Sequence, residues 1–211
     1  MQGGRQPKRI VAEGYDAVAE RYLTWAAKIP DASRSRYTQA LLDGLPAGAR
    51  VLELGCGAGM PTTLALAECF TVTGVDLSAR QIELARQAVP GATFIQSDMT
   101  ALDFPPASFD GVAAFFSLIH VPREEHAALL ARIADWLRPG GLLVATMGAR
   151  DTPGEVEDNW LGAPMYFSHW DAATNRRLVE KAGLRILRAT EETADEDGAP
   201  ITFLWILAEK P

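Results

Sequence analysis

The sequence predicts an α/β fold, a three-layer α/β/α sandwich built on a mostly parallel sheet. Short apolar runs alternate with segments of helical periodicity, a pattern typical of parallel strands packed between two layers of helices. The first of these apolar runs ends in a glycine-rich turn. The 211 residues suit one domain, and 48% hydrophobic and 22% charged residues are ordinary values for a globular chain.

The N-terminal region predicts a helix. Apolar residues recur at helical spacing from Val11 to Ala26, and Tyr15 and Tyr22 lie on one face of that helix. Residues 1–9 are polar and glycine-rich, so we expect them to be frayed.

The elements that follow are predicted from local patterns. Ser78 and Gln81 have the spacing of a capping box, which marks a helix start. We expect residues 148–170 to form an irregular insertion and the acidic cluster at 191–197 to form a solvated loop. The expected order is helix 36–45, strand 51–54, helix 61–69, strand 72–75, helix 79–88, strand 92–96, strand 109–116, helix 123–137, strand 142–146, a helix that Asp171 caps and Gly183 ends, and strands 184–189 and 201–208.

A glycine-rich turn and an acid at a strand end form the strongest functional pattern. Strand 51–54 leads into Gly55-Cys56-Gly57-Ala58-Gly59, and the next strand is followed by Asp76. Glycine lets the backbone approach a ligand closely, and a carboxylate can accept both hydroxyls of a ribose, so this pattern predicts an adenosine-containing ligand. A loop for a dinucleotide pyrophosphate reads G-x-G-x-x-G, whereas the third glycine here falls one residue early.

This spacing, with Glu53 two residues before the first glycine, resembles motif I of the class I S-adenosylmethionine (SAM) dependent methyltransferases. Four further segments also resemble that family: Ser97-Asp98-Met99, strand 109–116, the Pro139-Gly140-Gly141 turn before a strand, and the final strand pair. The resemblance covers roughly the whole chain from Tyr15 onward. It implies a Rossmann-like sheet of seven strands with an antiparallel C-terminal pair. It also implies SAM as cofactor and S-adenosylhomocysteine (SAH) as product.

The resemblance also implies roles for individual residues. Asp76 would bind the ribose, with a local helix cap as the alternative, and Asp98 and Met99 would bind adenine, with a plain loop acid as the alternative for Asp98. Glu53 would organise the glycine loop or meet the methionine ammonium. The N-terminal helix would close over the cofactor, with a tyrosine near the sulfonium, or simply pack in the core. The implied cofactor-binding residues are Tyr15, Tyr22, Glu53, Gly55, Cys56, Gly57, Gly59, Asp76, Leu77, Ser97, Asp98, Met99, Phe116 and Ser117, of which Cys56 is expected to be a small buried filler.

Two histidines are candidate catalytic residues. His120 follows the fourth strand at its carboxyl end, and His169 lies in the aromatic insertion. A histidine suits the removal of a proton from a hydroxyl or ammonium acceptor near neutral pH, and packing or structural roles are the alternatives. We expect His126 on a solvated face. The insertion residues expected to cover the acceptor are Trp160, Met165, Tyr166, Phe167 and Trp170.

Composition limits the partners. There are 20 basic and 27 acidic residues, a net charge of −7, so we expect no nucleic acid. Arg34 and Arg36 could reach a carboxylate, but we expect them at the surface. The chain lacks a long apolar run and a signal peptide, which predicts no membrane partner and, with two cysteines, a cytoplasmic location. No metal-ligand spacing is present, so we expect no metal.

We therefore predict methyl transfer to the O or N atom of a small-molecule acceptor by in-line displacement, in a monomer or homodimer. The alternative is a SAM-fold protein without methyl transfer, such as a cyclase, a rearrangement enzyme or a ligand-binding protein. An NAD-linked oxidoreductase and methylation of a protein are disfavoured. The single domain 1–211 would comprise an N-terminal helical lid (1–46), a cofactor-binding core (47–147), a substrate-lid insertion (148–170), and a C-terminal helix and strand pair (171–211).

Overall fold

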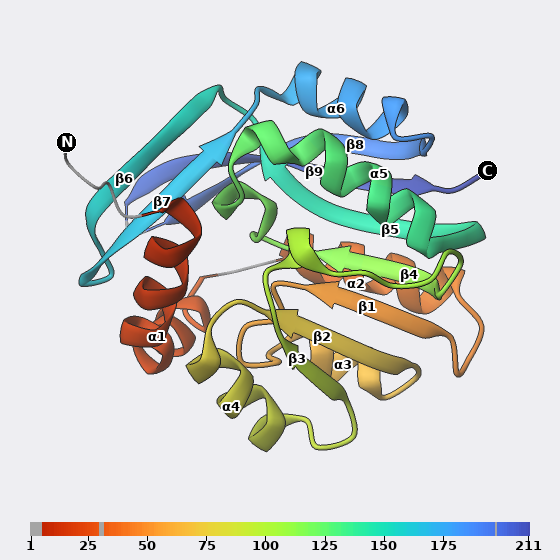
Figure 1. The fold of residues 1–211 in the computed structure, drawn as a ribbon, viewed down its shortest axis with the longest axis horizontal. Coiled ribbons are helices and arrows are strands. Elements are labelled where there is room, and N and C mark those ends of the chain that lie inside the picture. Colours follow the sequence, from red (N-terminus) through yellow and green to blue (C-terminus); the bar gives the residue numbers. More distant parts are fainter. Residues whose placement is uncertain (1–5, 30–31, 197) are drawn as a thin grey trace.

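The computed structural model describes residues 6–29, 32–196 and 198–211, and its centre is a seven-stranded sheet. The order of the strands is β3-β2-β1-β4-β5-β9-β8. Neighbours from β3 to β5 are parallel, and β9 is antiparallel to both β5 and β8, which confirms the predicted sheet (Figure 1). The strands are β1 (Arg50–Leu54), β2 (Thr71–Asp76), β3 (Thr93–Gln96), β4 (Phe109–Ala114), β5 (Leu137–Gly148), β6 (Thr152–Trp160), β7 (Ala163–His169), β8 (Arg185–Glu196) and β9 (Ala199–Glu209).

Helices cover both faces of this sheet. Successive strand residues point to opposite faces, so Leu52 and Leu54 share one buried cluster with α5 and α6, while Val51 shares another with Leu41 of α2 and Leu66 of α3. The helices are α1 (Pro7–Ala26), α2 (Ala32–Gly44), α3 (Thr62–Ala67), α4 (Ala79–Ala88), α5 (His126–Trp136) and α6 (Ala172–Lys181), with 3₁₀ turns at Met99–Ala101, Leu118–His120 and Arg123–Glu125.

Helix α1 stands at the carboxyl ends of the parallel strands, beside β7 (Figure 1). A Cβ at Gly14 would lie 2.6 Å from the carbonyl oxygen of Pro164, so a glycine there permits this close contact. The helix begins at Pro7, so the expectation of fraying is wrong for residues 7–9, and residues 1–5 lie outside the described part. Of the expected lid 1–46, α1 covers this edge, while Tyr37 and Leu41 of α2 pack in the core.

Two segments expected to be irregular are strands. Residues 148–170 form the hairpin β6–β7, in which Trp160 pairs with Ala163. The two-residue turn between them has positive φ at Leu161 and Gly162, a primed turn that asparagine-glycine would signal better than leucine-glycine. The acidic cluster belongs to β8 up to Glu196, with 197 outside the described residues. Since β8 is an edge strand, charged side chains there remain in water.

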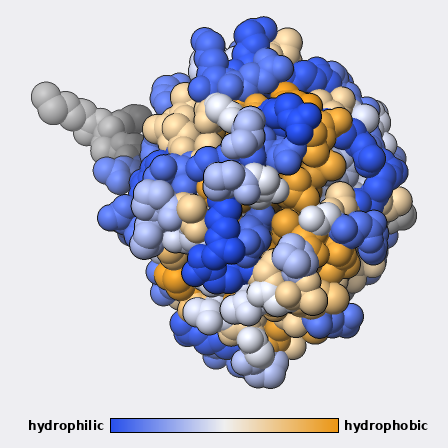
Figure 2. All heavy atoms as spheres, turned by 90° about the vertical axis from the view of Figure 1, so that its right-hand side faces the viewer, coloured by the Kyte–Doolittle hydropathy of each residue, from blue (hydrophilic) through white to orange (hydrophobic). Residues whose placement is uncertain are grey.

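Figure 2 views the opposite end of the molecule, the right-hand side of Figure 1. On this face, hydrophilic residues surround a band of hydrophobic ones. Apolar atoms make up much of the surface of any folded protein, so the band by itself calls for no partner. Among the described helices, none is both long and apolar enough to span a membrane.

Candidate functional site

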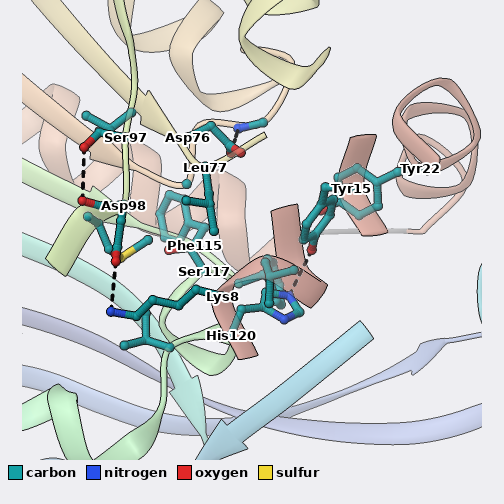
Figure 3. Close-up of a pocket in the computed structure, with 17 residues that line it drawn as sticks. Lys8, Tyr15, Tyr22, Asp76, Leu77, Ser97, Asp98, Phe115, Ser117 and His120 are labelled. Carbon is teal, nitrogen blue, oxygen red and sulfur yellow. Dashed lines mark hydrogen bonds and ion pairs between the residues drawn. The ribbon is translucent and has the colours of Figure 1, made fainter. Parts of the chain in front are cut away.

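A cavity of about 670 Å³ opens at the carboxyl ends of β1, β2 and β4, below α1 (Figure 3). This is the end of an open parallel sheet at which ligands bind. Eleven of the fourteen residues predicted to bind a cofactor line it, and Glu53, Cys56 and Gly59 are not among its described lining residues. The lining comprises Lys8, Val11, Tyr15, Tyr22, Gly55, Gly57, Val75, Asp76, Leu77, Ser97, Asp98, Met99, Phe115, Phe116, Ser117, His120 and Val121.

Asp76 holds the glycine loop in its shape. Its Oδ2 accepts a hydrogen bond from the backbone N–H of Gly57 and its Oδ1 accepts one from that of Ser78, both at 2.9 Å. Burial raises the pKa of this carboxyl above its usual value, although these bonds oppose the shift. Ser78 caps α4 by accepting from the N–H of Gln81, so Asp76 is not the cap of that helix.

Gly55 is required by a close approach of two loops. Gly55 has a φ of +76°, and a Cβ there would lie 2.3 Å from the Cβ of Ser117. The Ser117 hydroxyl donates to the carbonyl oxygen of Leu54 at 2.7 Å and ties the segment after β4 to the end of β1. The next residue before it, Phe116, has a φ of +52°, which is uncommon for a residue with a side chain.

Lys8 extends from the first turn of α1 into the cavity, and the sequence did not identify it as a site residue. Its Nζ is 2.9 Å from Asp98 Oδ2 and 2.5 Å from Glu125 Oε2, as Figure 3 shows for Asp98. Burial alone would raise the pKa of Asp98, but hydrogen bonds from Lys8 and Thr100 outweigh it and lower that pKa. Pro7 at the first helical position is a helix-start signal that could have identified Lys8 as part of α1.

Behind the loop, Glu53 and Cys56 are buried. Glu53 accepts a hydrogen bond from the hydroxyl of Thr63 in α3. Desolvation by burial raises the pKa of Glu53 to about 7, against the opposing effects of the Thr63 bond and the charge of Arg34. Burial likewise raises the pKa of the Cys56 thiol, so that thiol stays neutral at pH 7.

Replacing Glu53 by glutamine is expected to raise the free energy of unfolding of the ligand-free protein, relative to the wild type, by more at pH 8 than at pH 5. Because the folded pKa of about 7 exceeds the ordinary glutamate pKa of 4.5, the folded state keeps a proton that the unfolded state loses as pH rises above about 4.5. The resulting cost is on the order of 3 kcal/mol above pH 7, and the neutral amide avoids it.

Denaturant unfolding of the wild type and of Glu53→Gln at both pH values measures this difference. Glu68→Gln, at an exposed position, is the matched control and should change stability equally at the two pH values. An equal effect of Glu53→Gln at pH 5 and pH 8 would contradict the raised pKa.

Tyr15 and His120 form a hydrogen-bonded pair between α1 and the turn after β4 (Figure 3). His120 Nδ1 is 2.8 Å from the carbonyl oxygen of Tyr166, and since a carbonyl only accepts, Nδ1 carries the proton. The free lone pair on Nε2 therefore accepts from the Tyr15 hydroxyl, at 2.9 Å. Desolvation lowers the pKa of His120 to about 4, so the ring is neutral at pH 7.

A second cavity, of about 1440 Å³ with its open mouth, joins the first. Tyr15, Tyr22, Phe116 and His120 line both. The rest of its wall comes from α1, the start of α2, the loop before α3, the hairpin and β9. Its other lining residues are Leu23, Trp25, Ala26, Ala27, Ile29, Arg34, Ser35, Met60, Pro61, Ile119, Trp160, Phe167 and Phe203.

Arg34 was expected at the surface and lies at this second cavity instead. Helix α2 begins at Ala32, earlier than predicted, so Arg34 is in its first turn, where its guanidinium carbon is 4.9 Å from the ring centre of Phe116. Arg36 is exposed as expected and pairs with Glu192 at 2.7 Å.

The remaining predicted residues divide between the cavity wall and the layer behind it. Trp160 and Phe167 line the second cavity, whereas Met165, Tyr166 and Trp170 are not among the described lining residues. Met165 is fully buried beneath α1. Trp170 donates its indole N–H to the carbonyl oxygen of Arg123, whose guanidinium lies over its ring.

The other two histidines lie away from both cavities. His169 is 2.7 Å through Nδ1 from the carbonyl oxygen of Arg150 and is not among the described lining residues of either cavity. The expected solvated position of His126 is wrong, because its side chain is buried and its Nε2 is 3.0 Å from the carbonyl oxygen of Val121.

Known proteins with sequences similar to this chain include methyltransferases. A family model described as "Methyltransferase domain" matches residues 51–141. The chain is 34% identical over 210 residues to a phosphatidylethanolamine N-methyltransferase of Cereibacter sphaeroides, with 90% of this chain and 96% of that protein covered. It is 35% identical to a 27-O-demethylrifamycin SV methyltransferase of Amycolatopsis mediterranei over 63% of this chain and 56% of that protein.

The chain spans 56 to 60% of the length of several other curated relatives that it matches. Among solved structures, the [4+2]-cyclase SpnF has a TM-score of 0.75 at 20% identity, with 98% of this chain and 97% of that chain covered. That likeness concerns the fold, which does not by itself decide the reaction. The nearly complete coverage of the N-methyltransferase, the family model and the glycine loop agree: the chain belongs to the class I SAM-dependent methyltransferase family.

Proposed function

We propose that this chain transfers the methyl group of SAM to an oxygen or nitrogen atom of a small molecule by in-line displacement. The observation that carries this proposal is the junction of two cavities at Tyr15, Tyr22, Phe116 and His120. A transfer between two bound molecules needs two adjoining sites that align the reacting atoms and exclude water. Two of the similar proteins are an N-methyltransferase and a methyltransferase named for a 27-O-demethylated substrate, which favours these two atoms.

The residues of the first cavity fit SAM. Each Asp76 oxygen accepts one backbone N–H, and since a carboxylate offers about four lone-pair sites, each retains capacity for a ribose hydroxyl. Asp98 and Met99 lie further along the lining, where they would bind adenine, and Gly55 and Gly57 present bare backbone to the methionine part. When bound, SAM supplies a methyl group on a cationic sulfur.

Glu53 has the role of organising the glycine loop in this proposal. Its bond to Thr63 connects the end of β1 to α3, and it is buried behind the loop, not among the described residues that line either cavity. This favours the first of the two roles that the family resemblance left open.

His120 is the proposed general base, acting through Tyr15. An acceptor hydroxyl or amine at the junction would give its proton to the Tyr15 oxygen while the Tyr15 proton moves to His120 Nε2. The neutral ring can receive that proton, and the carbonyl of Tyr166 then stabilises the imidazolium through Nδ1–H. His169 is not proposed as the base, since it lies away from both cavities.

Methyl transfer is tested with purified protein, methyl-labelled SAM and a panel of phenols, carboxylic acids and amines, which includes dispersed phosphatidylethanolamine. The expected result is a labelled product with one added methyl group, together with SAH. Calorimetry with SAM, SAH and NAD accompanies the assay. Binding of SAM and SAH without methylation of any acceptor would contradict methyl transfer and favour a SAM-fold protein that rearranges or only binds its ligand.

A further inference from the structure

We infer that the second cavity takes an apolar small molecule with one anionic group, which Arg34 binds. The inference rests on the proposed function and deepens it, because it names the chemical class of the acceptor: a flat apolar body that carries a carboxylate, sulfonate or phosphate. Its basis is the chemistry of the described residues that form the cavity wall.

The wall is largely aromatic. Trp25 and Trp160 have ring centres 6.0 Å apart, and Phe167 and Tyr15 lie 6.2 and 5.5 Å from Trp160. Such rings provide broad apolar contact for a flat ligand at a low cost in side-chain entropy. The cavity volume of about 1440 Å³ leaves room for a ligand larger than one ring.

The described residues that line the second cavity carry one formal charge. Among the described residues that line the second cavity, Arg34 is the one charged side chain at neutral pH, since His120 is neutral, and the described lining includes no aspartate or glutamate. A cationic ligand would therefore meet repulsion from Arg34 and no carboxylate among the described lining residues, whereas an anionic group meets an opposite charge. This contrasts with the chain as a whole, whose net charge is −7.

Arg34 is placed on a rigid platform. Its guanidinium lies over Phe116, and that ring packs edge-on against Phe203 and Trp205, with centres 5.0 and 5.3 Å away. A guanidinium on an aromatic face, partly removed from water, binds a carboxylate or sulfonate more strongly than an exposed one. Because it has five N–H donors, Arg34 can bind a ligand while it keeps its contacts within the protein.

Two fluorescent probes that differ by one charge test this inference. 8-Anilinonaphthalene-1-sulfonate carries a sulfonate, and N-phenyl-1-naphthylamine has the same ring skeleton without it. Energy transfer from the tryptophans, of which Trp25 and Trp160 line this cavity, reports binding, measured with and without SAH. We expect the wild type to bind the sulfonate at least roughly tenfold more tightly than the neutral probe, as for one charged hydrogen-bonded contact.

Arg34→Gln should remove this preference while the affinity for the neutral probe stays unchanged. Arg36→Gln, two residues further along α2 and exposed, is the matched control and should keep the preference. Arg34→Lys retains the charge and should restore part of it, and it serves as the informative variant if Arg34→Gln does not fold.

Equal affinity of the wild type for both probes would overturn the inference, as would a preference that survives in Arg34→Gln. Loss of SAH affinity in Arg34→Gln, with the probe preference kept, would assign Arg34 to the cofactor instead. Calorimetry with SAH separates the two proposals: probe discrimination without SAH binding would reject methyl transfer alone, and SAH binding without discrimination would reject this inference alone.

Discussion

Replacing Asp76 by alanine is expected to weaken the binding of SAM and SAH by 100-fold or more. The side chain accepts one backbone hydrogen bond from Gly57 in the glycine loop and one from Ser78 at the start of α4, and under the proposed function it also accepts the ribose hydroxyls. Loss of hydrogen bonds to a charged group costs about 1.5–3 kcal/mol each, and two such losses suffice for this factor. Calorimetric titration with SAM and SAH measures it.

Asp110→Asn is the matched control for this variant. Asp110 also accepts from a backbone N–H, that of Arg50 at 2.7 Å, but it lies at the start of β4, at the other end of the sheet from the cavity. Its substitution should leave SAH affinity nearly unchanged even if stability falls. Asp76→Ala with the affinity of the wild type would refute the proposed cofactor site.

Replacing His120 by alanine is expected to lower kcat by about 100- to 10,000-fold, the range for loss of a general base, with a much smaller effect on SAH affinity. Under the proposed function, Tyr15→Phe removes the hydroxyl that connects His120 to the acceptor, so it should also lower kcat.

The pH dependence of the rate gives a second expected result. Because the pKa of His120 is about 4, the basic form of the ring persists down to about pH 5. Activity that depends on this form is lost as pH falls towards 4.

His169→Gln tests the competing assignment. Its Nδ1 contacts the carbonyl oxygen of Arg150 rather than a cavity, so kcat should stay within about twofold of the wild type. Turnover that survives in His120→Ala at saturating SAM would mean that the acceptor reacts without this base, as an already ionised acceptor would. A rate loss confined to His169→Gln would reverse the assignment of the two histidines.

The strand–loop–strand pattern was readable in the sequence because it depends on neighbouring residues. The apolar run before Gly55, the glycine spacing and the acid at Asp76 each follow from local backbone needs, and so does the cap at Ser78. The same locality explains why the order of elements and the paired C-terminal strands were predicted, whereas the hairpin at 148–170 was not. Its Leu161-Gly162 turn lacks the residues that usually mark such a turn.

Burial and contacts between residues far apart in the sequence could not be predicted from local patterns. His126 follows two glutamates yet is buried, Lys8 reaches Asp98 and Glu125, which are 90 and 117 residues away in sequence, and Arg34 lies over Phe116. Those positions depend on how α1, α2 and the hairpin pack at one edge of the sheet, and no local pattern encodes that packing.

The sequence by itself therefore determined the sheet, the glycine loop and the family, since these rest on short-range spacing. Only the tertiary structure decided which histidine meets Tyr15, which aromatic residues face a cavity, and where the cavity carries its positive charge. These properties arise when distant segments exclude water together, because desolvation sets the pKa of His120 and the strength of an ion pair at Arg34.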